Sequence, residues 1–181
     1  MNTLQIVGPA LAGLFAATTA LAQTSATAPD ASSAAAPQPA PTIGQGPGYH
    51  DPRSPFRPIT AREGVVPWPL LASVTSRAEK DRMLPVFPQD VQALNDRTVK
   101  LEGFMMPLEP GEKQRHFLLS SVPVTCAFCV PAGPEGLVEV RSRTPVKYTL
   151  EPVLVEGRLA VLSSDPYGLF YRITDAAPVQ P

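Results

Sequence analysis

Short segments in which apolar and polar residues alternate, each bounded by turn residues, constrain the fold of this chain more than any other feature. Apolar residues occupy every second position in 99–103, and the apolar run continues to Leu108. Alternation with a period of two is typical of a strand with one buried face. Pro110 and Gly111 predict a turn, and residues 116–122 predict the strand that returns beside the first. Further short strands are expected at 136–140, 146–155, 159–162 and 168–173.

Little of the sequence outside its first residues has a helical pattern. One short helix is expected at 88–94, where Pro88 suits the first helical turn. Glu156 and Gly157 predict the tight turn of a hairpin. Strands that have no helices to cover them protect their edges best when the sheet closes on itself. The sequence therefore predicts a mostly β domain, a small barrel or a sandwich, with a closed or partly open barrel preferred.

The first 22 residues have the pattern of a signal peptide. Residues 4–22 carry no charge and are mostly apolar, and they end in Ala20, Leu21 and Ala22, the small-x-small pattern that signal peptidase accepts. We expect cleavage after Ala22 and a mature protein in the periplasm. The alternative is a segment retained as a membrane anchor, because a bilayer span needs about 20 predominantly apolar residues. A lipoprotein is not expected, since the first cysteine is Cys126.

The rest of the chain divides into a linker and a domain. Residues 23–58 are dominated by Ala, Pro, Ser and Thr and contain few large apolar side chains. Such a segment cannot bury enough surface to offset the entropy of ordering it. We expect a disordered, Ala/Pro-rich and partly extended linker there. A β domain is expected at 59–176, with Trp68 as one anchor of its core, and a disordered tail at 177–181.

Charge and composition argue against several classes of function. The formal net charge is −1, whereas a nucleic-acid-binding domain more often has a basic excess. The cluster of Arg141, Arg143 and Lys147 is too small to predict nucleic-acid binding. No Ser/His/Asp order, carboxylate pair or Gly-rich phosphate loop stands out. We expect a protein that binds rather than catalyses, with the cysteines as the one open route to catalysis.

Cys126 and Cys129 form the one constellation with reactive chemistry, and three hypotheses remain open for them. In an oxidising compartment, an even number of cysteines favours a structural disulfide. A redox-active pair is the second hypothesis, although Pro131 and Pro134 interrupt the helix that such a motif usually opens. The third is metal binding, because two thiolates bind Zn or Cu well, with His116 about one strand upstream as a third ligand.

Three segments together resemble a known family. They are 66–71 (VPWPLL), 99–108 (VKLEGFMMPL) and 126–134, which begins with CAFC and ends with GP. They are similar to the bacterial exported family catalogued as domain of unknown function 3299 (DUF3299), and the likeness covers roughly 64–176. Its most specific part is the ordered pair of GFMMPL and CAFC-x3-GP.

The resemblance implies an OB-like β-barrel and an extracytoplasmic setting, and it provides no enzymatic activity. Members of the family often sit beside transporter genes linked to metal supply. The resemblance thus implies an ABC-type transporter or another periplasmic protein as the partner. It also adds weight to Zn or Cu as an ion held by Cys126, Cys129 and His116.

The leading hypothesis is an exported accessory protein, not an enzyme, that binds a metal ion and serves a transport system. One alternative is a periplasmic thiol-disulfide oxidoreductase that uses the same two cysteines. The other is a structural or interaction barrel whose cysteines form a disulfide staple.

Overall fold

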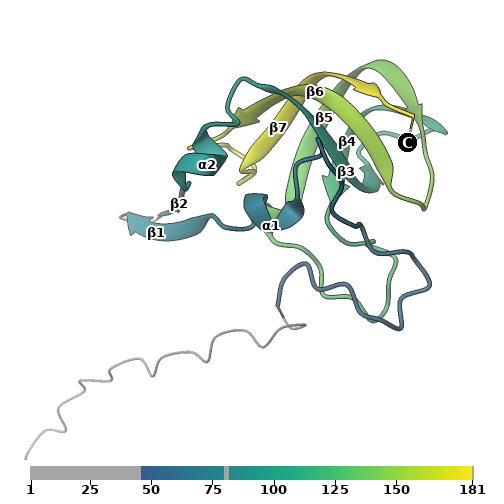
Figure 1. The fold of residues 1–181 in the computed structure, drawn as a ribbon, viewed down its shortest axis with the longest axis horizontal. Coiled ribbons are helices and arrows are strands. Elements are labelled where there is room, and N and C mark those ends of the chain that lie inside the picture. The colour runs from purple at the N-terminus through teal and green to yellow at the C-terminus, as the bar shows by residue number, and fades with distance from the viewer. Residues whose placement is uncertain (1–45, 80–81, 181) are drawn as a thin grey trace, which may run out of the picture. The chain divides into compact units, whose positions relative to one another are not determined.

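The structure is a computed structural model that describes residues 46–79 and 82–180. The predicted signal peptide (1–22) and residues 23–45 of the predicted linker lie outside the described residues. In the described part the chain forms two short α-helices, one 3-10 turn and seven strands (Figure 1). These are α1 (Trp68–Leu71), β1 (Thr75–Glu79), β2 (Arg82–Val86), α2 (Gln89–Gln92), β3 (Thr98–Pro107), β4 (Lys113–Ser120), η1 (Pro134–Gly136), β5 (Leu137–Lys147), β6 (Val153–Val161) and β7 (Tyr171–Pro178).

Five of the strands close into a barrel in the order β3-β4-β5-β7-β6, and β6 pairs with β3 to complete it (Figure 1). Neighbouring strands are antiparallel except β5 and β7, which run parallel. β1 and β2 form a separate two-stranded sheet. A closed five-stranded barrel with this order has the topology of an OB-type barrel. The predicted mostly β fold and OB-like barrel are therefore confirmed.

Alternating apolar side chains fill the barrel. A fully buried Leu, Ile, Val or Phe side chain stabilises a fold by about 1.5–3 kcal/mol relative to an exposed one. The alternation in residues 99–103 therefore places the apolar side chains of β3 on the face that lines the barrel interior. The buried core side chains on the five strands are Leu101, Met105, Phe117, Leu119, Val138, Val140, Val146, Val155, Leu159, Tyr171, Ile173 and Ala176.

Helix α1 is tied to the barrel by two hydrogen bonds. Trp68 is buried, as predicted, and its indole Nε1 donates to the carbonyl oxygen of Glu102 at 2.8 Å. The hydroxyl of Tyr171 donates to the carbonyl oxygen of Leu71 at 2.6 Å. A Cβ at Gly103 would lie only 3.1 Å from the Trp68 ring. The glycine of the GFMMPL segment therefore makes room for the tryptophan of the VPWPLL segment.

Glu156 and Gly157 do not form a turn, and that prediction is wrong. β6 runs through both residues, and its pairing with β7 shifts register beside them. A Cβ at Gly157 would lie 2.5 Å from Cγ2 of Ile173 and 2.8 Å from the carbonyl oxygen of Thr174. The glycine is needed for the close approach of β7. The connection between β5 and β6 is instead residues 148–152, so the predicted strand at 146–155 is also wrong.

The remaining elements are short. The predicted helix at 88–94 is confirmed as the single turn α2, with Pro88 as its N-cap. The sheet of β1 and β2 was not predicted, because β1 is exposed at every residue and has no alternating apolar pattern. Among the described residues, no helix has the length and apolar character that crossing a bilayer requires.

Residues 46–58, the described part of the predicted linker, contact the barrel, and we call them the N-terminal strap. The Phe56 ring packs edge-on against Phe104 of β3, with centroids 6.3 Å apart, and the His50 ring lies 6.1 Å from the same phenyl ring. At the other end, β7 extends to Pro178, two residues into the predicted tail. The folded part is thus longer at both ends than 59–176.

Candidate functional site

Cys126 and Cys129 lie in the connection between β4 and β5, and a disulfide joins them. We call residues 121–133 the disulfide loop. The two Cα atoms are 5.4 Å apart, within the usual range for a disulfide. Cys126 is buried and Cys129 is partly buried. The geometry of the pair therefore suits a disulfide that cross-links the loop.

The N-terminal strap holds the disulfide loop through the backbone and one cation. The amide of Gly48 donates to the carbonyl oxygen of Val130 at 3.2 Å, and the amide of Val130 donates to that of Tyr49 at 3.0 Å. The guanidinium of Arg53 lies 4.7 Å from the centre of the Phe128 ring, a cation–π contact. The conformation of the loop therefore depends on the strap as well as on the disulfide.

Asp51 orients the arginine of that contact. Its carboxylate accepts hydrogen bonds from Nε and Nη2 of Arg53, both at 2.9 Å, and from the Arg53 amide at 2.8 Å. These hydrogen bonds lower the pKa of Asp51 to about 2. The carboxylate is thus ionised at neutral pH, and Arg53 keeps its place over the loop.

Exposed apolar side chains surround the disulfide. Val124, Phe128 and Val130 of the disulfide loop are exposed, Phe128 to 47%. Val124 also shares a small hollow with Tyr148 and Leu150, which are exposed too. Contiguous exposed apolar surface often marks a site of interaction. The disulfide loop therefore combines a cross-linked backbone with an apolar rim.

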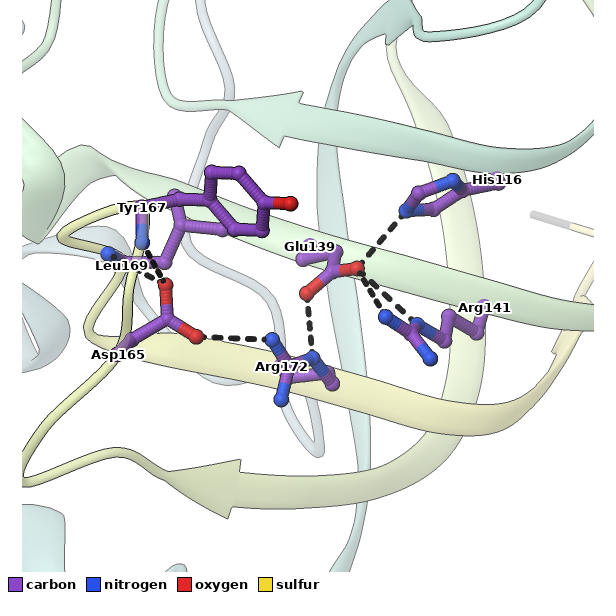
Figure 2. A network of polar contacts seen from close by, with 7 residues as sticks. All are labelled: His116, Glu139, Arg141, Asp165, Tyr167, Leu169 and Arg172. Atoms are coloured by element: carbon purple, nitrogen blue, oxygen red, sulfur yellow. Dashed lines mark hydrogen bonds and ion pairs between the residues drawn. The ribbon is translucent and has the colours of Figure 1, made fainter.

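His116 belongs to a different cluster, which surrounds Glu139 (Figure 2). His116 Nε2 lies 2.8 Å from Oε1 of Glu139, and Nε of Arg141 donates to the same oxygen at 3.0 Å. Arg172 donates from Nε to the other oxygen, Oε2. The side chain of Glu139 is only 5% exposed, because these three side chains close over it.

Strand pairing creates this cluster. Glu139 lies between Val138 and Val140, whose side chains are buried in the barrel, so the carboxylate is on the outer face of β5. The register places Glu139 opposite Arg172 of β7 and His116 of β4 opposite Arg141. Glu139 is not among the residues predicted for a site, although alternation alone places it outside the barrel. The parallel pairing of β5 with β7, which supplies Arg172, leaves no local signal in the sequence.

Asp165 extends the cluster into the connection between β6 and β7 (Figure 2). Its Oδ2 accepts a hydrogen bond from Nη2 of Arg172 at 3.0 Å. Its Oδ1 accepts from the amides of Tyr167, at 2.9 Å, and Leu169, at 3.3 Å. Arg172 therefore bridges two carboxylates and ties this connection to the outer face of β5.

The cluster favours the charged form of the Glu139 carboxylate. Burial alone would raise the pKa of Glu139, but hydrogen bonds from Arg172, His116 and Arg141 together bring it below its usual value. An efficient general acid needs a pKa near the working pH, and this carboxylate is displaced in the opposite direction. The cluster therefore fixes structure and charge rather than supplying an acid.

The structure does not bring the predicted metal ligands together. Cys126 and Cys129 share the disulfide, whereas His116 is engaged with Glu139. Across residues 46–79 and 82–180, no group of three or more His, Cys, Asp or Glu is placed to hold a metal ion. The second histidine, His50, lies in the strap, where its Nε2 is 3.1 Å from the carbonyl oxygen of Phe56. Zn or Cu binding stays a prediction.

Comparison with known proteins finds a family model and a solved structure that are similar to this chain. The profile of the family described as "Protein of unknown function (DUF3299)" matches residues 71–169. A DUF3299 family protein of known crystal structure, from Pseudomonas aeruginosa, is 26% identical, with a TM-score of 0.40. That match covers 49% of this chain and 65% of the Pseudomonas chain. No curated protein matches.

Proposed function

The chain belongs to the DUF3299 family, whose description assigns no activity, and from its own residues we propose that it is a non-enzymatic binding protein. It works outside the cytoplasm, as the apolar first 22 residues suggest. Its partner is another exported protein or a transporter of the ABC type, whose action it assists.

The single observation that carries this proposal is that the two cysteines form a disulfide with each other. Cys126 and Cys129 are the one reactive constellation found in the sequence, and their sulfurs are joined to each other. The disulfide loop in turn packs against the N-terminal strap. A disulfide in this position stabilises the conformation of the disulfide loop and of the surface that the loop exposes. Binding of a partner to that surface requires no reactive group.

Two alternatives remain proposals with less support. A Zn or Cu site at Cys126, Cys129 and His116 requires reduced thiols and a histidine released from Glu139. An oxidoreductase usually has a cysteine at the N-terminus of a helix, which lowers the thiol pKa. After Cys129 the described chain continues in irregular backbone, and only the three-residue turn η1 precedes β5.

Intact-mass measurement on protein purified from the periplasm, after alkylation of any free thiols, tests the proposal. We expect an unalkylated, oxidised chain that carries no metal ion under native conditions. The Cys129→Ser variant is the matched control, because its single thiol must react if the reagent reaches the loop. Alkylated thiols together with an ion that a chelator removes would replace the proposal with the metal site. Insulin reduction faster than with Cys129→Ser would replace it with the oxidoreductase.

A further inference from the structure

The near-neutral net charge of the chain hides a separation of charges between two faces of the barrel. On and beside β3 and β6, cations pair with carboxylates. These pairs are Arg62 with Glu102 at 2.5 Å, Lys100 with Glu156 at 3.7 Å, and Arg158 with Asp96 at 3.0 Å. These pairs offset much of the positive charge there, although Arg97, just before β3, pairs with no carboxylate of the described residues.

The outer face of β4 and β5 differs, because most of its cations have no carboxylate partner. We call this set the basic strip; it consists of Lys113, Arg115, His116, Arg141, Arg143 and Lys147. Only His116 and Arg141 pair with a carboxylate, that of Glu139. For the other four, no carboxylate of a described residue lies within ion-pair distance.

Strand register sets these cations side by side. Lys113 is directly opposite Lys147, and the next pair, Gln114 and Val146, is buried in the barrel. The two lysines therefore point outward together, and like charges in such a cross-strand pair destabilise a sheet. A pair of like charges without a carboxylate at ion-pair distance among the described residues is a feature expected where an anion binds.

The two arginines between these lysines and Glu139 are held in place without being neutralised. Arg115 donates from Nη1 to the carbonyl oxygen of Arg143. Arg143 donates from Nε to the carbonyl oxygen of Asp175 at 2.9 Å. Each guanidinium keeps its full charge and has further N–H groups to donate.

We infer that the basic strip is the docking face for an acidic, extended polypeptide segment of a partner protein. The inference rests on the proposed binding function and gives it a surface and a partner chemistry. Along β5, Arg143 follows Arg141 by two residues and Lys147 follows Arg143 by four, so all three lie on one face of the strand, where two residues span about 6.6 Å. Alternate carboxylates of an extended peptide repeat at the same spacing.

The chemistry of the strip favours carboxylates. The same face already binds one, since Arg141 and His116 hold Glu139, and guanidinium groups match carboxylate geometry.

A labelled twelve-residue peptide of alternating Glu and Ser, titrated with the full chain, tests the inference by fluorescence anisotropy. We expect saturable binding whose Kd rises about tenfold between low and physiological salt, because exposed charges are screened. The double variant Lys113→Gln/Lys147→Gln and the single variant Arg143→Gln should each raise the Kd about fivefold or more. The matched control, Lys100→Gln/Arg158→Gln, removes paired cations of β3 and β6 and should change the Kd less than about twofold.

Each other outcome overturns the inference. A Kd that moves equally in the strip variants and the control, or no binding, removes the strip as a docking face. Tighter binding of oligothymidylate, or of vesicles that contain an anionic phospholipid, through the same residues would replace the acidic polypeptide with that ligand. Thermal melting of every variant reports its folding. Because these titrations do not involve the cysteines, failure here is distinct from failure of the proposed function, which the thiol measurement reports.

Discussion

Glu139 is an acidic residue on the outer face of a strand, and it is nevertheless buried beneath three side chains that hydrogen-bond to it. Its folded pKa is lowered, so its charge stabilises the folded state at neutral pH. This contribution is complete above the unfolded pKa, near 4.5, and is lost as the pH falls through the folded pKa.

We predict that Glu139→Gln lowers the free energy of unfolding by about 2 kcal/mol at pH 7, because hydrogen bonds to a charged acceptor are lost. Urea unfolding of wild type and variant from pH 7 down to pH 3 measures the difference. The difference in the free energy of unfolding between wild type and variant should shrink below pH 4.5, because the ionised Glu139 carboxylate stabilises the folded state less as the pH falls. The control Glu156→Gln removes an exposed carboxylate paired with Lys100 and should cost less than about 1 kcal/mol at any pH. A pH-independent loss in Glu139→Gln would contradict the account.

The buried hydroxyl of Tyr171 makes a second residue-scale prediction. Burial, with a smaller effect from the charge of Glu135, raises the pKa of Tyr171, so the phenol stays protonated and donates to Leu71. Tyr171→Phe leaves the Leu71 carbonyl oxygen without this donor and should cost about 1 kcal/mol in urea unfolding. Tyr167→Phe changes a side chain that is 86% exposed and should have no measurable effect. Equal stabilities for the two variants would show that the hydrogen bond contributes nothing.

At the scale of elements, β6 depends on Gly157. Gly157→Ala places a methyl group against Ile173 and the backbone of β7, and we expect a loss of about 1–3 kcal/mol. In Gly133→Ala the new methyl group would meet mainly the flexible carboxylate of Glu135, which can rotate away. Thermal melting of both variants tests this. A Gly157→Ala protein as stable as Gly133→Ala would mean that β7 does not approach β6 this closely.

The same glycine shows what local sequence can and cannot predict about elements. The strands with clear alternation, such as β3, and the helix after Pro88 were predicted, because their patterns are local. Gly157 was interpreted as a turn residue, since glycine is common both in turns and where two backbones come close. The two roles of a glycine can be distinguished here only from the partner strand β7, whose Ile173 lies sixteen residues later in the sequence.

At the scale of the whole molecule, the candidate site was predicted in part. The spacing of the two cysteines is visible in the sequence, and the disulfide is one of the three hypotheses that the spacing leaves open. The ligand role expected for His116 has no counterpart in the described residues, where the histidine meets Glu139 through strand register. The basic strip was noticed only as a small cluster at 141–147. Lys113 and Arg115, which complete it, come from another strand.

The central claim is that Cys126 and Cys129 form a structural disulfide in a protein that binds rather than catalyses. The most direct test is the reduction potential of this pair, measured by equilibrating the folded protein in dithiothreitol redox buffers and alkylating the thiols. Because the loop and the strap pack together around the oxidised pair, we predict a potential below about −270 mV, the value for thioredoxin, with the control Cys129→Ser unresponsive. A potential between about −120 and −180 mV, the range of protein-oxidising catalysts, would contradict the claim.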